Sequence, residues 1–516
     1  MIQAGQLAYY AKSKGSLKPV KAAHNFKTVK ERVPLLWGDE MYVISIDGDH
    51  ANVSLKGHHL QIKIADLRET PLLSVYQIDC GQGDSALVHF PDGRWMMVDG
   101  GPPRDWSNSG KIAADFLYWK MFVDQSWKNE FNYRREPFHI EALVCTHPDY
   151  DHFGGFMELT KSVKGQGKTL TYGTVYHNGM GRYSGIPATK YENGKGFGQL
   201  GPVEGGDLPD AFLTALLDTF DDVREYAEPS GTRQWKLSGT YGEWLKSLAD
   251  LEGQGVGALK HLHHGIGNLP GTDGLNYSVK VLGPFVEEWN GKPALRYLDS
   301  ASVDTMESPS LTRNGQSVVL RIDYGNVRTL LTGDLNFRSH ALLLTNIDKE
   351  EFSCHVAKAC HHGSEDVSST FLRAMSPWAT MFSSGDNEAY AHPRARALGL
   401  AGAFGQVRSR GKNRYLGLEE DKHLTPLIYS TELSRSIELF PPYAIFNAEG
   451  LRVEKCEMQA RGRTALEGGV RAPMKDWLLA RSMVYGLINV RTDGTKVVLG
   501  VLKESEDAYQ VEEFTP

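Results

Sequence analysis

The stretch CTHPDYDHFGG, residues 145–155, decides both the fold and the chemistry that this sequence predicts. Four potential metal ligands fall close together in it: His147, Asp149, Asp151 and His152. The apolar pair at 143–144 precedes the stretch, which indicates a loop at the end of a strand. Such a loop can turn several side chains toward one point, and imidazole together with carboxylate suits Zn²⁺ or Mn²⁺. The alternative is a charged turn with a helix cap, which this spacing of ligands disfavours.

Two later segments also end apolar runs with metal-binding residue types. At 329–334 the run ends in Gly-Asp, and the two oxygens of Asp334 suit a carboxylate that bridges two cations. At 356–364 the run ends in the pair His361 and His362. A bare Gly-Asp turn and a loop histidine pair are the alternatives for these segments.

Two tight turns earlier in the chain carry single carboxylates. The turn at 81–85 contains Asp84, and the turn at 99–101 contains Asp99. Their place after strand-like runs predicts that they orient the ligands or face the substrate.

Together these segments resemble the metallo-β-lactamase superfamily, and more narrowly the hydrolase domain of the ComEC family of DNA-uptake competence proteins. The shared motifs follow the family's order between about residue 72 and residue 393. They are GQGDS (81–85), DGG (99–101), HPDxDHxGG (147–155), NxxSVVL (314–320), TGD (332–334), HHGS (361–364) and HP (392–393). The resemblance implies an α/β fold, the four-layer αββα metallo-β-lactamase sandwich.

The resemblance also implies two divalent metal ions, Zn²⁺ or Mn²⁺. One ion would be held by His147 and Asp149, and the other by three residues: Asp151, His152 and His361. Asp334 would bridge the two ions. Asp149 and Asn314 stand where many relatives have histidine, which weakens nitrogen ligation of the first ion and favours Mn²⁺ there.

Further site residues are expected around the two ions. An activated hydroxide would attack the substrate, and the residues expected in catalysis are Asp151, Asp84, His392 and Lys358. Residues expected to contact substrate or to orient the ligands are Asp99, Asn314, Ser317, His362, His177, Arg394 and Arg396. For His177 and His392 a structural role is the alternative.

The predicted function is a metal-dependent phosphodiesterase, most simply a nuclease that acts on DNA or RNA. Basic residues between 394 and 414 add a local hint, because a basic strip with aromatic neighbours can track a phosphate backbone. A salt-bridged loop face explains the strip equally well. Two other functions stay open: hydrolysis of a small ester, lactone or phosphocholine-type group, and a non-catalytic scaffold with a vestigial site.

Composition limits the other classes of function. The net charge of −7 over 516 residues excludes a generic polyanion binder. Five cysteines without a CxxC pair favour a reducing compartment. The N-terminus lacks the pattern of a secretory signal, and no apolar run approaches the ~18 residues that span a bilayer. We therefore expect a cytoplasmic protein without membrane insertion.

Changes in the pattern of strand-like and helix-like runs divide the chain into three predicted parts. Residues 1–70 form a small β domain, an SH3-like barrel, in which Asp-Gly at 47–48 joins two alternating runs as a hairpin. Residues 71–440 form the hydrolase domain, with a helical insertion near 156–277. Residues 441–516 form a C-terminal α+β extension.

Overall fold

The computed structural model describes residues 2–516 except for several stretches. These are 24–25, 27–29, 107–111, 133–136, 165–169, 187–199, 206–209, 299–310, 386–391, 416–417, 425 and 504–507. Between 432 and 485 it describes only short strands: β29 (Ile445–Phe446), β30 (Arg452–Val453), β31 (Cys456–Glu457), β32 (Gln459–Ala460), β33 (Arg463–Thr464) and β34 (Val470–Arg471). Any helix of the predicted C-terminal extension in that interval lies outside the described residues.

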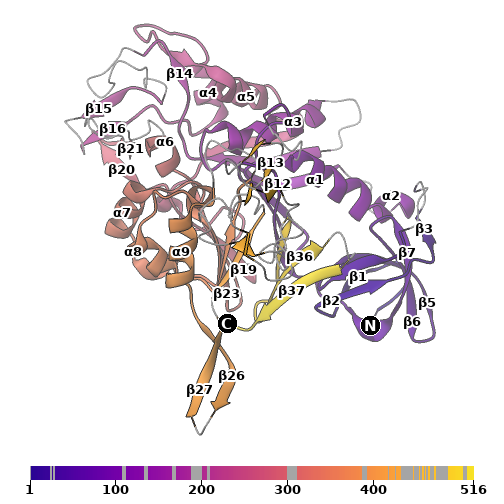
Figure 1. The fold of residues 1–516 in the computed structure, drawn as a ribbon. Helices are drawn as coiled ribbons and strands as arrows, with labels where there is room; N and C mark the ends of the chain where they lie inside the picture. The colour runs from indigo at the N-terminus through magenta and orange to yellow at the C-terminus, as the bar shows by residue number, and fades with distance from the viewer. Residues whose placement is uncertain are drawn as a thin grey trace.

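Two β-sheets form the centre of the protein (Figure 1). In spatial order the first sheet contains β18 (Val256–His261), β13 (Leu170–His177), β12 (Phe138–Val144), β11 (Trp95–Val98), β10 (Ala86–His89), β9 (Leu73–Gln77), β35 (Ile488–Thr492), β36 (Val497–Lys503) and β37 (Ala508–Phe514). The second contains β19 (Tyr277–Gly283), β22 (Val319–Tyr324), β23 (Val327–Leu331), β24 (Val356–Lys358), β25 (Ala379–Phe382) and β28 (Leu427–Ser430).

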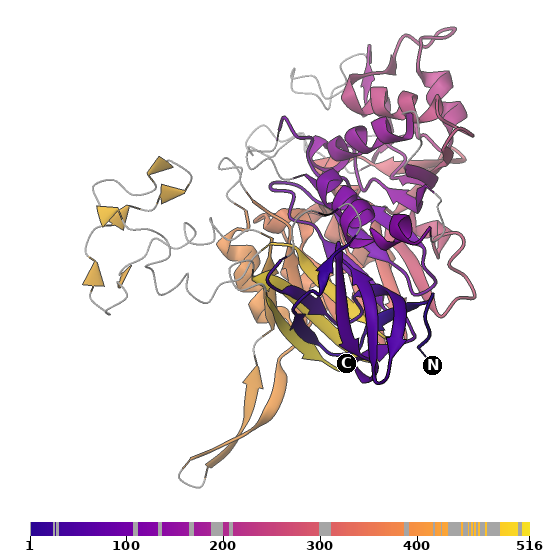
Figure 2. The same ribbon diagram turned by 90° about the vertical axis from the view of Figure 1, so that its right-hand side faces the viewer.

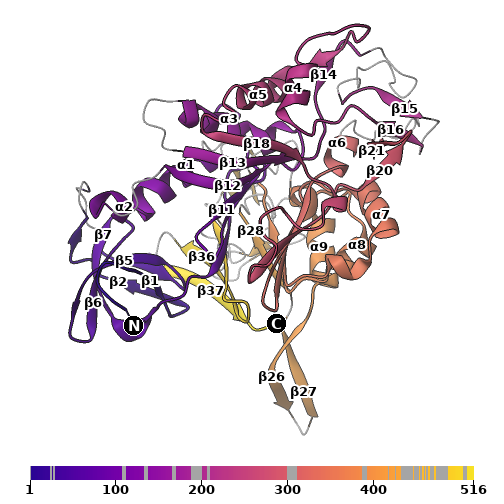
Figure 3. The same cartoon turned by 180° about the vertical axis from the view of Figure 1, so that it is seen from behind.

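Helices flank both sheets on their outer faces (Figures 1 and 3). Near the first sheet lie α1 (Ala113–Trp119), the π-helix η2 (Lys120–Asp124), α2 (Trp127–Glu130), α3 (Tyr150–Lys164), α4 (Phe220–Tyr226) and α5 (Gly239–Ala249). Near the second sheet lie α6 (Leu311–Gly315), α7 (Phe337–Asn346), α8 (Ser369–Met375) and α9 (Ala395–Phe404).

The sheets pack face to face because their strands are apolar on both sides. Val75 of β9 shares one buried cluster with Val281 and Leu320 of the second sheet. Tyr76, the next residue of β9, points the other way into a cluster with α1, α3 and α5. A third cluster joins the outer face of the second sheet to α7 and α8. The layers are therefore helix, sheet, sheet and helix, which confirms the predicted αββα sandwich.

Parallel pairing places the functional loops at a common edge. β11, β12, β13 and β18 run parallel in the first sheet, and β23, β24, β25 and β28 run parallel in the second. The loops at the carboxyl ends of parallel strands gather at one edge of a sheet. Most of the motifs singled out in the sequence lie in these loops.

The N-terminal residues form a separate β unit beside α2 (Figure 1). Its strands are β1 (Leu7–Tyr10), β2 (Lys14–Leu17), β3 (Lys21–Ala22), β4 (Val33–Leu36), β5 (Glu40–Asp47), β6 (His50–Leu55), β7 (His58–Lys63) and β8 (Leu67–Arg68), with the short 3₁₀ helix η1 (Ile64–Asp66) before β8. The predicted hairpin is present, because β5 pairs with β6 and Gly48 takes the positive φ of 59° that its turn needs. The SH3-like assignment stays a prediction.

The insertion is shorter than the sequence analysis places it. Predicted at 156–277, it would include β13 and β18, yet both strands pair within the first sheet. The inserted elements lie between them and are β14 (Tyr183–Ser184), β15 (Val203–Gly205), β16 (Ala211–Leu213), α4, β17 (Lys236–Leu237) and α5. After β19, β20 (Val286–Trp289) and β21 (Lys292–Arg296) extend the small sheet that β15 and β16 begin.

The C-terminal strands belong to the hydrolase core. Residues 441–516 are predicted from the sequence to form an extension, but β35 pairs antiparallel with β9 and continues the first sheet through β36 and β37. Val490 and Leu499 are buried in the cluster between the two sheets. A pairing between strands some four hundred residues apart leaves no local signal in the sequence.

A buried ion network joins the N-terminal unit to these C-terminal strands. Asp39 Oδ2 lies 2.5 Å from Lys56 Nζ, and Asp39 Oδ1 lies 2.8 Å from Arg491 Nη1. Burial by itself would raise the pKa of Asp39, but Lys56 and Arg491 hold it well below its usual range. Because all three side chains are buried, each charge depends on the others for its compensation.

We predict that Asp39→Asn lowers the free energy of unfolding by about 3–5 kcal/mol, since it leaves two buried cations without their anion. Urea unfolding followed by tryptophan fluorescence measures the change, with the exposed Asp49→Asn as the matched control. The depressed pKa means that the stability contributed by Asp39 is present above pH ~4 and is lost as the pH falls below it. Equal stability of the two variants at neutral pH would contradict this role.

Candidate metal centre

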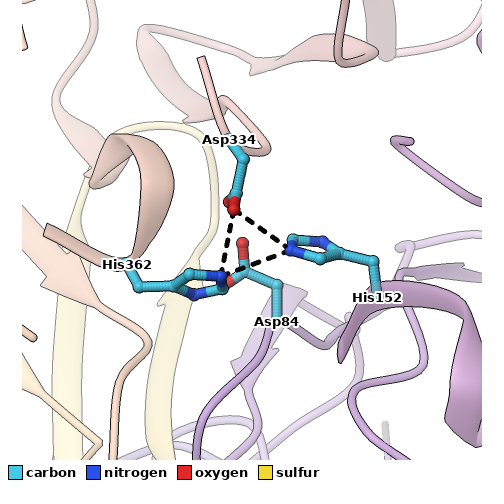
Figure 4. Close-up of side chains that lie close together, drawn as sticks. All are labelled: Asp84, His152, Asp334 and His362. Carbon is cyan, nitrogen blue, oxygen red and sulfur yellow. Dashed lines mark hydrogen bonds and ion pairs between the residues drawn. The ribbon is translucent and has the colours of Figure 1, made fainter. Parts of the chain in front are cut away.

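Four buried side chains from both sheets meet at the loop edge (Figure 4). They are Asp84, His152, Asp334 and His362, and each offers a ligand atom within 4.8 Å of the others. Asp84 follows β9, and His152 lies in the first turn of α3 after β12. Asp334 follows β23, and His362 follows β24. The sandwich thus brings together four motifs that are far apart in the sequence.

Three of these atoms have the spacing of a metal's coordination shell. His152 Nε2 and His362 Nε2 lie 3.3 Å apart, and Asp334 Oδ2 lies 3.3 Å from the first and 3.1 Å from the second. Zinc bonds of about 2.0–2.1 Å in a tetrahedron place neighbouring ligand atoms ~3.3–3.4 Å apart. The donor set therefore fits a divalent transition metal.

Each imidazole of the cluster is anchored through its other nitrogen. His152 Nδ1 lies 2.8 Å from Asp99 Oδ2, and the same carboxylate accepts hydrogen bonds from the backbone and hydroxyl of Thr146. His362 Nδ1 lies 3.0 Å from the carbonyl oxygen of Ser383. With a proton on Nδ1 donated to these acceptors, each ring turns its Nε2 lone pair to the cluster, as in known metal sites.

A second group of potential ligands lies on the other side of Asp334. The buried His147 has Nδ1 3.2 Å from Ser317 Oγ, while its Nε2 makes no hydrogen bond to any described residue. His361 Nε2 lies 3.8 Å from Asp334 Oδ2 and 3.2 Å from Asn314 Nδ2. A buried imidazole nitrogen without a hydrogen bond is costly unless it binds a ligand.

The two aspartates of the first motif have different surroundings. Asp151 Oδ2 lies 3.4 Å from His362 Nε2 and so joins the cluster. Asp149 Oδ2 lies 3.8 Å from His147 Nε2, but Oδ1 is paired with two guanidinium groups, Arg313 at 2.5 Å and Arg182 at 3.1 Å. Burial raises the pKa of Asp149, and the two arginines oppose that rise.

Asp84 is paired with a buried lysine. Lys358 Nζ contacts the carboxylate of Asp84, donates to the carbonyl of Gly333 at 2.7 Å and lies 3.4 Å from Asp334 Oδ1. Burial would lower the pKa of Lys358, but Asp84 and Asp334 raise it above its usual value, so the ammonium stays charged. Lys358 thus compensates only part of the negative charge that the cluster's carboxylates carry, and a divalent ion could compensate the rest.

His392 lies at the rim of the cluster. Its ring centroid is 5.8 Å from that of His361 and 6.1 Å from that of His362. Burial lowers the pKa of His392 to about 3, so this ring is neutral at neutral pH. The backbone N–H of Arg394 donates to Gly363 at 2.8 Å, which ties the start of α9 to the same loop edge.

Two residues that were predicted to contact substrate or orient ligands, His177 and Arg396, instead contact residues outside the four-residue cluster. His177 Nε2 lies 2.8 Å from the carbonyl of Leu217, and Nδ1 lies 3.3 Å from Tyr241 Oη. These contacts tie His177 to the insertion. The Arg396 guanidinium lies 3.4 Å from the carbonyl of Val367.

Several residues that complete the site carry no predicted role in the sequence. Arg182 and Arg313 hold Asp149, Ser383 anchors His362, and Thr146 binds Asp99. Thr146 and Arg313 each adjoin a motif residue, which is the only sequence signal that points to them.

We expect Zn²⁺ or Mn²⁺ at about 1,000 times its dissociation constant to raise the free energy of unfolding by about 4 kcal/mol. His362→Ala should weaken metal binding at least tenfold, because it removes one corner of the ligand triangle. Isothermal titration calorimetry and thermal unfolding with and without a chelator measure both effects. His139→Ala, at an exposed position of β12, is the control, and an equal loss in both variants would contradict the assignment.

Two sequence comparisons match parts of this chain. Residues 78–167 match the sequence profile of the Metallo-beta-lactamase superfamily. Competence protein ComA of Neisseria gonorrhoeae is 34% identical over 120 residues, which is 22% of this chain and 16% of ComA. The match thus spans less than a fifth of that protein's length.

Three solved structures align with about two thirds of this chain at low sequence identity and low TM-score. The metallo-beta-lactamase fold protein YhfI from Bacillus subtilis is 9% identical and covers 64% of this chain and 93% of its own, with a TM-score of 0.31. Tm1679, a metal-dependent hydrolase of the beta-lactamase superfamily, is 11% identical and covers 67% and 98%, with a TM-score of 0.29. A diphosphatase from the PhnP family is 10% identical and covers 68% and 98%, with a TM-score of 0.28. Residues 78–167, which contain His147, Asp149, Asp151 and His152, thus resemble the Metallo-beta-lactamase superfamily in sequence.

Proposed function

We propose that this protein is a metal-dependent phosphodiesterase that cleaves DNA or RNA. The observation that carries the proposal is the triangle of His152, His362 and Asp334 atoms at 3.1–3.3 Å, with Asp151 beside it. Four potential ligands from three separate motifs at this spacing are expected in a working metallohydrolase and not in a scaffold with a vestigial site.

We propose two ions, Zn²⁺ or Mn²⁺, on either side of Asp334. One ion would take Asp151, His152 and His362, and the other would take His147, Asp149 and His361, with Asp334 between them. The sequence expectation places His361, not His362, beside Asp151 and His152. We place His362 there because its Nε2 lies 3.1 Å from Asp334 Oδ2, whereas Nε2 of His361 lies 3.8 Å from the same atom. Divalent ions there would supply Lewis acidity and lower the pKa of bound water toward ~7.

Neighbouring residues of the protein would orient the metal ligands and keep them in the correct protonation state. Asp99 fixes the tautomer and orientation of His152 through the 2.8 Å contact with its Nδ1. Lys358 holds Asp84 and Asp334 as carboxylates by its charge. The neutral ring of His392 and the main chain of Arg394 line the rim where a substrate would enter.

An aromatic pair beside the first motif favours nucleic acid as the substrate. Trp106 is 41% exposed, and its ring centroid lies 5.8 Å from that of Tyr150. Tyr150 stands between Asp149 and Asp151 in the chain. Exposed aromatic rings at the rim of a phosphodiesterase site suit stacking with nucleobases. Hydrolysis of a small ester, lactone or phosphocholine-type group is the second candidate. Such a substrate needs no exposed aromatic rings for stacking.

The location of the protein stays a prediction. None of the described helices is long and apolar enough to cross a membrane. Cys80, Cys145, Cys354 and Cys360 are buried free thiols, which is in line with the reducing compartment predicted from the sequence.

The activity is tested with bis-p-nitrophenyl phosphate and with single-stranded DNA, duplex DNA and RNA, each in the presence of Mn²⁺ or Zn²⁺. Asp151→Ala should lower kcat/KM at least 100-fold, because it removes a ligand of the cluster. The control is Asp49→Ala, which removes an exposed carboxylate far from the site. If neither the model diester nor any nucleic acid is cleaved with either metal, the proposed function is wrong.

Trp106→Ala separates the two candidate substrate classes. Loss of one stacking interaction is worth about 1–3 kcal/mol, so KM for single-stranded nucleic acid should rise about tenfold. KM for bis-p-nitrophenyl phosphate should change much less, since that substrate has no run of stacked bases. The exposed Trp119→Ala on α1 is the matched control. Equal KM values of Trp106→Ala and wild type for every nucleic acid would favour the small-molecule candidate.

A further inference from the structure

A cavity of about 390 Å³ lies where the N-terminal unit meets the hydrolase core. Figures 1 and 2 show the N-terminal strands beside the C-terminal strands β36 and β37, and both β2 and β4 contact β37. The cavity wall combines Val33 of β4, Trp119 of α1 and Leu502 of β36. Binding sites for small molecules commonly have volumes of about 300–1,000 Å³. The four-residue cluster of the metal centre contributes nothing to this wall.

Most of the cavity wall is apolar. Its aromatic residues are Phe26, Phe116 and Trp119, and its aliphatic residues include Val123 and Leu487. Apolar surface that a ligand removes from water contributes about 25 cal/mol per Å² to binding. The wall therefore suits a ligand with an apolar body.

Two polar groups of the wall have unused hydrogen-bonding capacity. Lys56 Nζ donates to Asp39 Oδ2 at 2.5 Å and to the carbonyl of Pro34 at 3.0 Å. An ammonium group has three N–H bonds, and the third has no acceptor among the residues that the structure describes. The ring centroid of Tyr509 lies 5.6 Å from the same Nζ, and its hydroxyl makes no hydrogen bond to a described residue. Burial raises the pKa of Tyr509, so the hydroxyl keeps its proton and can donate it to a ligand.

The remaining polar residues of the wall do not change this picture. His58 Nε2 accepts from the backbone N–H of Lys30 at 3.2 Å, so Nδ1 carries the proton and donates to the carbonyl of Lys56 at 2.8 Å. The side chain of Lys30 is exposed and cationic. Within the described part of the chain, no carboxylate lines the cavity. The side-chain groups left to meet a ligand are therefore donors, which favour an anion.

The ion network around Lys56 also has an excess of positive charge. Asp39 is the carboxylate partner of both Lys56 and Arg491. Nε of Arg491 is buried and makes no hydrogen bond to any described residue. One carboxylate thus compensates two cations.

The neighbouring charges do not remove this excess. Lys120 has a carboxylate of its own, because its Nζ lies 2.5 Å from Asp124 Oδ2. Burial raises the pKa of Glu40, and Lys128 and Lys120 oppose that rise. Each of these carboxylates therefore already faces a cation of its own. An excess charge away from water is costly unless an anion compensates it.

We propose that this cavity binds a small apolar carboxylic acid in its anionic form. The carboxylate would accept hydrogen bonds from Lys56 and Tyr509 and would balance the excess positive charge. The apolar body would lie against Trp119 and the aliphatic part of the wall. A fatty acid and an aromatic acid share this chemistry, because each joins one carboxylate to an apolar body. The inference does not depend on the proposed hydrolase activity.

Isothermal titration calorimetry of the full-length protein tests the proposal, with a chelator present so that the metal centre does not contribute. The probes are dodecanoate, below its critical micelle concentration, and 2-naphthoate. We expect at least one of them to bind with a dissociation constant of about 1–100 μM. The charge controls are dodecyltrimethylammonium and 2-naphthol, which should bind at least about tenfold more weakly than the matching acid. Binding of only one acid identifies the body as linear or aromatic.

Three variants locate the binding. Lys56→Met should raise the dissociation constant at least about tenfold, and it leaves Asp39 paired with Arg491, so the buried charges stay balanced. Val123→Trp fills the cavity and should abolish binding while keeping Lys56. Phe122→Trp is the matched control, because it enlarges the next residue of η2, which is 47% exposed and outside the wall, and it should bind like wild type. Urea unfolding confirms that each variant is folded.

Three results would overturn the proposal. The first is that neither acid binds to wild type at concentrations up to about 1 mM. The second is that the charge controls bind as tightly as the acids, since the site would then not select an anion. The third is that Val123→Trp binds like wild type, since the acid would then lie elsewhere.

Discussion

The carboxylate of Asp334 is held between the two sheets by positively charged or metal-binding groups on several sides. Its Oδ2 lies 3.1 Å from His362 and 3.3 Å from His152, and its Oδ1 lies 3.4 Å from Lys358. A buried carboxylate without such partners would cost several kcal/mol. The cluster therefore requires the loop after β12 and the loops after β23 and β24 to meet, and the αββα sandwich is the arrangement that makes them meet.

The histidine rings of the site are held in place by residues that contact their Nδ1 atoms and lie outside the four-residue cluster. Asp99, Ser383 and Ser317 each engage the Nδ1 of a histidine, so the inward nitrogens are directed before any ligand binds. Asp99 directly follows β11, Ser383 directly follows β25, and Ser317 lies two residues before β22. The geometry of the centre is thus a property of the packed sheets, and changes in the sandwich core will reach the ligands through these contacts.

Sequence alone predicts the sandwich and most of the loops that build the centre, because strand-end motifs have fixed positions in a parallel sheet. It could not tell His361 from His362, since both residues take positive φ values, 46° and 53°, and no periodicity sets side-chain directions in such a turn. The place of β35 beside β9 rests on a pairing too distant to leave a local pattern. The run of basic residues likewise gave no sign that α9 separates Arg394 from the basic residues of β26 (Arg408–Tyr415).

The two halves of the centre differ in their electrostatics, and Asp149 shows why. Arg313 and Arg182 bind one oxygen of its carboxylate, at 2.5 Å and 3.1 Å, and so reduce its attraction for a further cation. On the other side of Asp334, Asp151 contacts His362 and belongs to the tighter cluster. A divalent ion therefore finds the stronger field beside Asp151. The half near Asp149 combines an imidazole, a carboxylate and two guanidinium groups, and guanidinium is the side chain best suited to grip a phosphate. The first motif thus places a carboxylate of the ligand cluster and a carboxylate paired with two arginines on one loop.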